Sequence, residues 1–231
     1  MTQFQIAPYE IQKHAAQVQE LYDRYLIPTY LKRLGIGEDE RTQYSDIEDV
    51  LDVNAAYNEK FEGFSFVVID SSGQVKGVQL SYMFGKDDCE NAFPELNRKV
   101  VEENKHKESI MKYCQHRYEV CKILYDLYER YGFERAIYLE STVLHPDVRG
   151  KGINQRLTDH LTSHTDEVIF VEGQIPVDVY IKHYGLNATL IGEMVAHNGF
   201  LMVTRILSYD LFVVPIEIRL SKKTKSISSK L

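Results

Sequence analysis

Apolar residues recur every three or four positions in several stretches of the chain, which is the spacing of helices with one buried face. We expect the first of these helices to stop before Pro28, because proline has no amide hydrogen to donate. We expect the last one to end at Asn198 and Gly199, which favour the left-handed conformation of a helix C-cap. The expected helices cover 18–26, 108–131, a stretch that begins at 153, and 187–197, with one more inside 37–52.

Other stretches are rich in β-branched and aromatic residues and are bounded by turn-forming residues, so they predict strands. Two of them are expected to pair as a hairpin around the turn 71–74. The order of helices and strands predicts an α/β fold with a mixed sheet covered by helices. The expected strands are 64–70, 75–84, 135–144, 167–171 and 200–211.

Length and composition fit one soluble domain. The chain has 231 residues, of which 44% are hydrophobic and 26% are charged, ordinary values for a globular protein. No linker composition divides it, so residues 1–220 are expected to form a single domain. No apolar run is long enough to cross a membrane, and the N-terminus lacks the pattern of a signal peptide. We therefore expect a cytoplasmic protein with no membrane partner.

The formal net charge of −7 argues against nucleic acid as the main partner. Much of the negative charge lies in 37–52, which is expected to be a solvated loop and helix face, or else an electrostatic funnel for a cationic substrate. The last eleven residues, 221–231, hold four lysines and no acidic side chain. This lysine-rich segment is expected to be a disordered tail, because it has too few apolar residues to bury.

The cysteine pattern predicts no metal site. Cys89, Cys114 and Cys121 form no CxxC pair and have no zinc-type spacing. Cys114 and Cys121 are seven residues apart, which places both on one face of the expected helix 108–131. Two buried thiols in a reducing compartment explain them best.

The segment most informative about chemistry is a strand, a proline-containing turn and a helix. Its turn reads Arg149-Gly150-Lys151-Gly152 and opens directly into the expected helix at Ile153. Two glycines let backbone N–H groups point at one spot, and the helix dipole adds positive potential there, so the turn predicts an anion site. The spacing fits neither a P-loop nor a dinucleotide fingerprint. On its own, such a glycine-rich turn is a weak signal.

The wider segment 144–154, Leu-His-Pro-Asp-Val-Arg-Gly-Lys-Gly-Ile-Asn, makes the signal specific. It closely resembles the acetyl-CoA signature of the GNAT superfamily of N-acetyltransferases, a strand that leads through V-H-P-x-x-R-G-x-G-x-G/A into a helix. Asn198-Gly199-Phe200 resembles the Gly-Phe that ends the last helix of that superfamily. The resemblance implies a mixed, mostly antiparallel sheet flanked by helices, with 85–131 as a helical insertion before the CoA-binding strand. It also implies acetyl-CoA as co-substrate.

The same resemblance assigns the cofactor-binding residues. It implies that the end of the strand pairs its backbone with the pantetheine arm of CoA, through Thr142, Val143 and Leu144. It implies that the turn binds the pyrophosphate through backbone amides, over Arg149, Gly150, Lys151, Gly152, Ile153 and Asn154. The sequence departs from the pattern at Asn154, where the family has glycine or alanine.

Glu140 is the candidate catalytic base. An amine must lose a proton before it attacks a thioester, and Glu140 lies within an apolar strand, where a carboxylate is costly without a role. Strand periodicity aligns it with Tyr138 and Thr142, and catalytic histidines of the serotonin N-acetylating branch align with Tyr138 and Glu140. The alternative is a strand glutamate paired with an arginine or lysine. Many family members carry a tyrosine acid where this chain has Val195, so no general acid is assigned.

The sequence therefore predicts an acyltransferase that acetylates a primary amine. The helical insertion and the second N-terminal helix resemble the layout of the arylalkylamine (dopamine) and polyamine N-acetyltransferases, which favours a small-molecule amine as partner. Acetylation of a protein N-terminus or lysine, and a non-catalytic acyl-CoA-binding module of GNAT fold, remain alternatives. The protein is expected to be a monomer or a homodimer.

Overall fold

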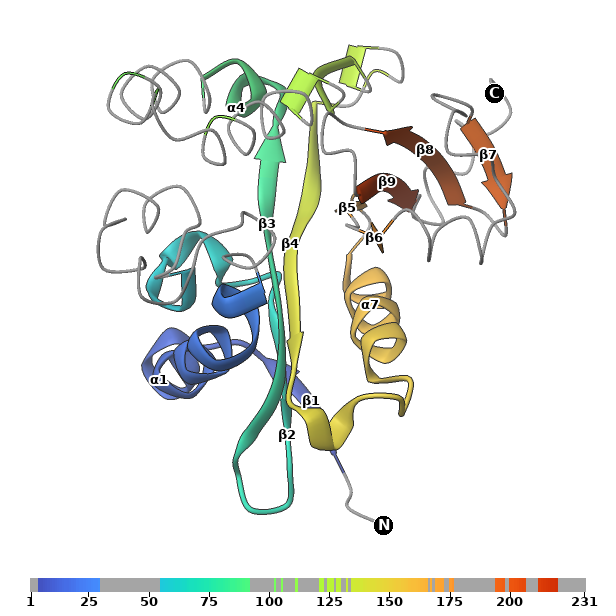
Figure 1. The fold of residues 1–231 in the computed structure, drawn as a ribbon. Coiled ribbons are helices and arrows are strands. Elements are labelled where there is room, and N and C mark those ends of the chain that lie inside the picture. The colour runs from blue at the N-terminus through green and yellow to red at the C-terminus, as the bar shows by residue number, and fades with distance from the viewer. Residues whose placement is uncertain are drawn as a thin grey trace. The chain divides into compact units, whose positions relative to one another are not determined.

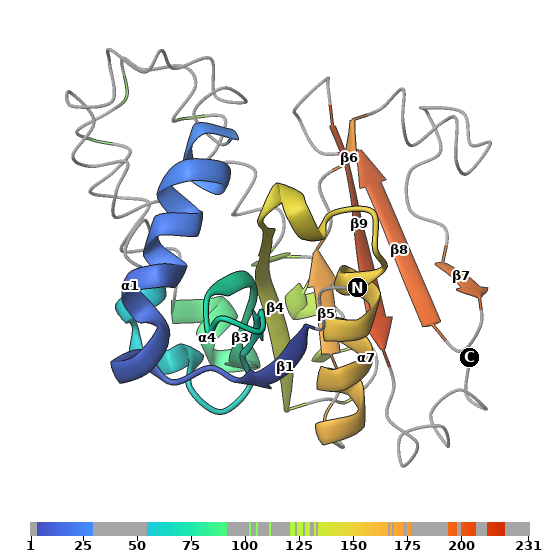
Figure 2. The same ribbon diagram turned by 90° about the horizontal axis from the view of Figure 1, so that it is seen from below.

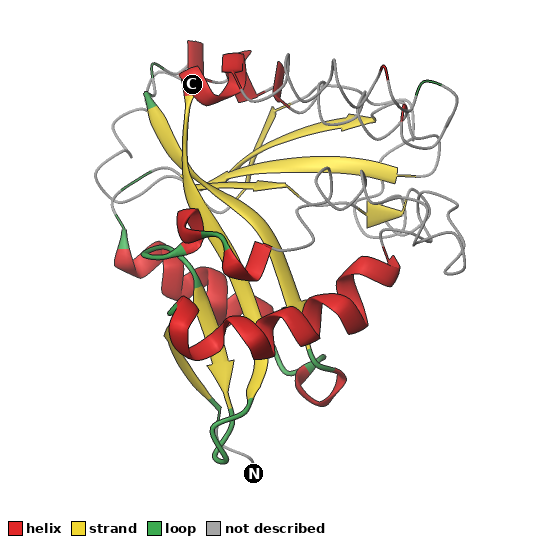
Figure 3. Cartoon of the chain, turned by 90° about the vertical axis from the view of Figure 1, so that its left-hand side faces the viewer, coloured by secondary structure: helices red, strands yellow, loops and turns green. Residues whose placement is uncertain are grey.

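The computed structural model describes the backbone of most of the chain. In Figure 3 its helices are red, its strands are yellow, and the residues outside the description are grey. The description covers 4–29, 55–91, 102, 105, 111, 121–122, 124–126, 128–129, 132, 134–165, 167, 169–172, 175–176, 194–197, 200–206 and 212–219. Two compact units share these residues, one made of 1–83, 102–110 and 139–164, and the other of 84–101, 111–138 and 165–231.

The first unit is built on neighbouring strands in the order β1-β2-β3-β4. The register of β1 with β2 and of β2 with β3 is antiparallel. The strands are β1 (Gln5–Pro8), β2 (Phe66–Ile69), β3 (Val75–Gly85) and β4 (Arg135–Leu144), of which β3 and β4 continue into the second unit. Short 3₁₀ helices occupy Ala55–Tyr57, Glu59–Phe61 and Pro146–Val148.

Two helices cover opposite faces of this sheet, as Figures 1 and 2 show for α1 (Ile11–Leu21) and α7 (Ile153–His164). The backbone continues from α1 into a π-helix over Tyr22–Leu26. Each helix buries one apolar stripe against the strands, because burying such a stripe removes apolar surface from water. The buried residues include Val18 and Leu21 on α1, Leu157 and Leu161 on α7, and Val67, Val78 and Leu80 on the strands.

The second unit holds α4 (Lys86–Asn91) and the remaining strands. Its strand order continues as β4-β5-β9-β8-β7, with β6 paired to β9, and every register given for these pairs is antiparallel. The strands are β5 (Ile169–Glu172), β6 (Ile175–Pro176), β7 (Met194–His197), β8 (Phe200–Ile206) and β9 (Phe212–Arg219). The Tyr128 side chain is buried there, and its hydroxyl donates a 2.5 Å hydrogen bond to the carbonyl of Phe84.

Most predicted elements that lie among the described residues are confirmed. The hairpin forms from β2 and β3, and β4 has the predicted bounds, 135–144. Helix α7 begins at Ile153 as predicted, and the predicted strand 167–171 forms as β5 two residues later. The described residues of 108–131 that carry an assignment, among them 121–122 and 124–126, are helical. The architecture is the predicted mixed α/β class.

The predicted helix over 187–197 is wrong at its end, because residues 194–197 form β7. The register of β7 with β8 pairs His197 with Phe200, which leaves only Asn198 and Gly199 between the strands. Asn-Gly between apolar residues is the strongest short hairpin signal, so this pair joins two strands instead of ending a helix. Val195 therefore lies on a strand opposite Met202. Residues 187–193 lie outside the described residues.

The first helix also runs further than expected. Residues 27–29 are helical, so Pro28 does not stop it. The preceding π-helix widens the backbone where the Pro28 ring would otherwise crowd the preceding turn. The Thr29 hydroxyl then donates a hydrogen bond to the carbonyl of Tyr25 at 2.8 Å, which satisfies an acceptor in this last turn.

The structure also contains elements that the sequence did not predict. The sequence missed β1 and α4, and its strand 200–211 ends at Ile206, with β9 as a separate strand. The acidic stretch 37–52 and the lysine-rich tail 221–231 lie outside the described residues, as does Cys114. Cys89 and Cys121 are buried. The single domain over 1–220 stays a prediction.

The start of α1 generates a pH prediction. His14 is only 9% exposed, and its Nδ1 accepts a 3.0 Å hydrogen bond from the backbone N–H of Glu10. Burial lowers the pKa of His14, so folding favours its neutral form. This contribution to stability is complete above the unfolded pKa of about 6.5 and is lost as the pH falls through the lower folded value.

We expect the melting temperature of the wild type to fall more than that of His14→Gln between pH 8 and pH 5. Glutamine keeps an acceptor for the Glu10 N–H but has no proton to gain. A hydrogen bond of about 0.5–1.5 kcal/mol corresponds to a gap of roughly 1–6 °C. Parallel curves for the two proteins across this range would contradict the assignment.

Candidate functional site

Backbone hydrogen bonds fix the first residues of the loop between β4 and α7. The His145 N–H donates to the carbonyl of Lys76 on β3 at 2.9 Å, and the Val148 N–H donates to the carbonyl of His145 at 3.0 Å. The Asp147 N–H donates to Nδ1 of His145 at 3.2 Å, which caps the 3₁₀ turn. Val148 is fully buried, so this turn is anchored in the core.

The two glycines of the loop adopt a conformation that other residues disfavour. Gly150 and Gly152 have φ angles of +71° and +69°. A Cβ atom added at either position would meet nothing within 4 Å, so glycine is required here for backbone conformation and leaves open space beside the loop. Both residues are exposed. An approaching group therefore has direct access to the backbone of the loop.

Helix α7 starts immediately after this loop. The Arg156 N–H donates to the carbonyl of Gly152 at 3.1 Å, while the N–H groups before it have no partner inside the helix. Ile153 is buried at 2% exposure, whereas Asn154 is exposed. The helix dipole adds positive potential at this end. The loop and the first turn of α7 thus have the geometry that the sequence predicted for an anion site.

The two basic side chains of the loop fold back onto neighbouring groups. Nε of Arg149 donates to the carbonyl of Leu144 at 2.9 Å, and its guanidinium lies 5.3 Å from the centre of the Tyr25 ring. Nζ of Lys151 lies 5.4 Å from the centre of the Phe4 ring. Arg149 therefore ties the loop to the end of β4, and both side chains add positive charge beside it.

The C-terminal half of β4 alternates between two environments. Ser141 and Val143 are buried, and the Ser141 hydroxyl is hydrogen-bonded to the hydroxyl of Tyr22 in the π-helix. Glu140, Thr142 and Leu144 are half-buried and, by strand alternation, share the opposite face. The structure thus places Glu140 in line with Thr142, as the sequence predicted, next to the strand residues assigned to pantetheine.

Two polar contacts of this region were not predicted from the sequence. One is the Tyr22–Ser141 pair, and the other is a hydrogen bond from Gln79 Nε2 on β3 to Thr158 Oγ1 on α7, at 3.2 Å. The available signal was a polar residue inside an apolar pattern: Gln79 lies within a strand, and Thr158 adjoins Leu157 on the buried stripe. The sequence alone does not show which residues pair, because Tyr22 and Ser141 are 119 positions apart and Gln79 and Thr158 are 79 positions apart.

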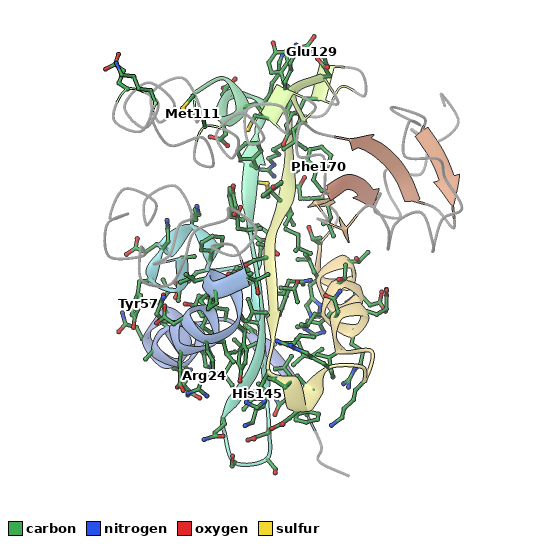
Figure 4. All side chains as sticks on the ribbon, in the orientation of Figure 1. Arg24, Tyr57, Met111, Glu129, His145 and Phe170 are labelled. Atoms are coloured by element: carbon green, nitrogen blue, oxygen red, sulfur yellow. The ribbon has the colours of Figure 1, made fainter. Side chains whose placement is uncertain are left out.

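A pocket of about 180 Å³ lies on the α1 side of the first unit. Its polar lining includes Glu20 on α1, Arg24 in the π-helix, Lys76 on β3, and His145; Figure 4 labels Arg24 and His145. None of the residues predicted to bind acetyl-CoA lines it. Glu20 and Arg24 form an ion pair with each other at 3.1 Å. This pocket therefore meets the β4–α7 loop at His145 but not at the residues predicted to bind acetyl-CoA.

The described part of the chain carries neither a metal-ligand cluster nor a membrane helix. No group of three or more His, Cys, Asp or Glu side chains there is arranged to hold a metal ion. No helix in that part combines the length and apolar character needed to cross a membrane.

No protein-family model matches the sequence, and no curated protein matches it. Solved structures do match, with the fold of GNAT N-acetyltransferases. A polyamine N-acetyltransferase from Drosophila melanogaster, which forms N-acetylagmatine, has 11% identity and a TM-score of 0.58 over 94% of this chain and 99% of its own.

An agmatine N-acetyltransferase matches with 12% identity and a TM-score of 0.60, over 93% of this chain and 98% of its own. Arylalkylamine N-acetyltransferase 2 from Aedes aegypti matches with 14% identity and a TM-score of 0.54, over 94% and 98%. Identities this low establish the fold. The chain therefore has the GNAT fold that the resemblance of residues 144–154 implied.

The Tyr22–Ser141 pair generates a stability prediction. Both residues are buried, with exposures of 3% and 8%. Tyr22→Phe removes one hydroxyl and leaves the Ser141 hydroxyl without this partner, which should cost about 1–3 kcal/mol of unfolding free energy. The double variant with Ser141→Ala should regain much of that loss, because it removes both polar groups. Additive losses in denaturant titrations of the two single variants and the double variant would exclude this coupling.

Proposed function

We propose that this protein is an N-acetyltransferase, which moves an acetyl group from acetyl-CoA to a primary amine. The observation that carries the proposal is the β4–α7 loop, where two glycines of positive φ lead into the N-terminus of a 12-residue helix. Backbone N–H groups and a helix dipole directed at one open spot are suited to a diphosphate. The GNAT fold of polyamine and arylalkylamine N-acetyltransferases supports the same assignment.

In this proposal the chain binds acetyl-CoA mainly through its backbone. The amides of Gly150–Asn154 hold the diphosphate, whereas the Arg149 N–H already donates to the carbonyl of Pro146 at 3.1 Å. The side chains of Arg149 and Lys151 add positive potential around the site. The backbone of Thr142–Leu144 holds the pantetheine arm along β4.

Glu140 is proposed to take the proton of the acceptor amine. A free alkylamine has a pKa near about 10, so at neutral pH it must be deprotonated before it can attack. Glu140 is half-buried and, by strand alternation, lies on the same face of β4 as Thr142. Acetyl-CoA supplies the activated acetyl group when it is bound, and Glu140 accepts the proton directly or through water.

A small amine is the proposed acceptor. Structural neighbours with TM-scores of 0.54–0.60 carry names that specify polyamine, agmatine and arylalkylamine substrates. The net charge of −7 attracts amines, which are cations in solution. These two observations favour a polyamine or an arylalkylamine over an anionic or neutral acceptor.

Gly152→Val should abolish acetyl-CoA binding, because its side chain would fill the open space beside the loop amides and its backbone would resist a φ of +69°. Binding of a ligand to the native state raises the melting temperature by mass action. We therefore expect acetyl-CoA to raise the melting temperature of the wild type and leave that of Gly152→Val unchanged.

Gly132→Val is the matched control, because Gly132 has a φ of +67°, is exposed, and also has no atom within 4 Å of an added Cβ. It should lower stability by a similar amount yet keep the shift with acetyl-CoA. A wild-type shift in Gly152→Val, or no shift in the wild type, would remove the anion-site assignment.

Glu140→Gln should lower turnover by about 10²–10⁴, the usual range for a general base, with little change in acetyl-CoA affinity. Glutamine keeps the size of the side chain and removes its ability to take a proton. The loss should shrink as the pH approaches the pKa of the amine, since the amine then loses its proton unaided. Steady-state rates from pH 6 to pH 10 measure both effects.

Glu62→Gln is the control for the loss of one negative charge. Glu62 is exposed, and its Oε1 accepts a 2.8 Å hydrogen bond from the Ile11 N–H, which an amide oxygen also accepts. This variant should keep wild-type turnover. Near-normal turnover and an unchanged pH profile in Glu140→Gln would mean that Glu140 is structural.

A further inference from the structure

A buried polar chain links the centre of the sheet to the first turn of α7. Gln79 Nε2 donates to Thr158 Oγ1 at 3.2 Å, and Thr158 Oγ1 donates to the backbone carbonyl of Asn154 at 3.0 Å. We call these three residues the Gln79–Thr158–Asn154 bridge. It connects β3 to the turn of α7 whose N–H groups form the anion site of the proposed function.

The bridge stands where apolar residues would be expected. Thr158 is 5% exposed and lies on α7 between the buried positions of Leu157 and Leu161. Gln79 is fully buried on β3, opposite Phe66 of β2. Burying an amide and a hydroxyl costs free energy that leucine or valine would not cost, and threonine is also a weaker helix former.

The bridge also leaves one polar atom unsatisfied. Among the described residues, Oε1 of Gln79 has no hydrogen-bond partner although it is buried. A buried acceptor without a partner is rare in folded proteins and lowers stability. Two apolar residues at these positions would avoid the cost of burying polar groups, so stability alone does not explain the bridge and its presence points to a second role.

We propose that Gln79 and Thr158 are positioning residues for acetyl-CoA binding, which fix the first turn of α7 against the sheet. Apolar contacts hold a helix on a sheet but tolerate small shifts along its axis and small rotations. A hydrogen bond from β3 to a side chain that is itself bonded to the Asn154 carbonyl restricts both movements. The amides of the first turn are then held in place before the diphosphate arrives.

This proposal rests on the proposed function, and it predicts effects that a purely stabilising role does not produce. Thr158→Val keeps the shape of the side chain and removes the hydroxyl, and Gln79→Leu removes the amide. Each variant should weaken acetyl-CoA binding in calorimetry on the order of tenfold, since small displacements of positioned groups cost up to about a hundredfold. Amides of 153–158 should exchange with solvent faster in the free protein. Thr158→Ser, which keeps the hydroxyl, should retain wild-type affinity and exchange.

Thr162→Val is the matched control. Thr162 lies one turn further along α7, and its hydroxyl donates to the carbonyl of Thr158 at 2.7 Å, the same type of bond in the same helix. This variant loses one threonine hydroxyl but keeps both hydrogen bonds of the bridge. Its acetyl-CoA affinity and the exchange of 153–158 should match the wild type.

The double variant Gln79→Leu/Thr158→Val separates the two roles. It removes both polar partners, so its melting temperature should return to or exceed that of the wild type. Its acetyl-CoA affinity should stay low and its exchange at 153–158 fast. Recovery of affinity and slow exchange along with stability would overturn the proposal, as would single variants that bind and exchange like the wild type.

Failure of the proposed function is a different outcome. If wild-type protein does not bind acetyl-CoA, the anion-site assignment falls whatever the variants do. Hydrogen exchange in the free protein then decides whether the bridge fixes α7: faster exchange in the single variants, but not in Thr162→Val, supports it. Unchanged exchange excludes it.

Discussion

Only eight residues connect the end of β4 to the start of α7, and this short connection is the constraint on which the rest of the structure depends. It brings the positive end of a helix dipole next to the end of a partly open strand. The connection is possible because two glycines supply positive φ and because Val148 anchors the turn in the core. Two further bonds, His145 to Lys76 and Arg149 to Leu144, hold the turn against the sheet.

The two faces of β4 have different roles under the same constraint. One face carries Ser141, whose bond to Tyr22 joins the strand to the π-helix that follows α1. The other carries Glu140 and Thr142, which are half-buried. A strand packed on both faces would leave no room for a ligand, and one exposed on both would not fix the turn. Because β4 is packed on one face and partly open on the other, it can fix the turn and still leave room for a ligand.

The strand–turn–helix unit could be predicted from sequence because its signals are local. The apolar run 135–144, the two glycines and the stripe at Ile153 and Leu157 each specify their own backbone conformation. The prediction failed where two local signals compete: Asn198-Gly199 fits a helix end and a hairpin turn equally well, and the β-branched and apolar residues around it pair as strands. The prediction that Pro28 ends the first helix was also wrong, since the π-helix before Pro28 accommodates its ring.

Contacts between distant residues were beyond prediction. Gln79 and Thr158 are 79 residues apart, and each looks like an ordinary polar interruption of an apolar pattern. The alignment of Glu140 with Thr142 was predictable because strand alternation is a local rule, whereas its chemical role is not contained in that rule. Fold and site geometry thus follow from short-range patterns, while the couplings that tune the site come from tertiary structure.

The central claim is catalysis of acetyl transfer, and the most direct measurement follows labelled acetyl groups from acetyl-CoA to a panel of acceptors. The panel holds agmatine, spermidine, an arylalkylamine and a lysine-containing peptide, with a reaction lacking acceptor as the blank. The account predicts turnover with at least one small amine, above the blank and above the peptide. Binding of acetyl-CoA without transfer to any acceptor would contradict it and identify a binding module instead.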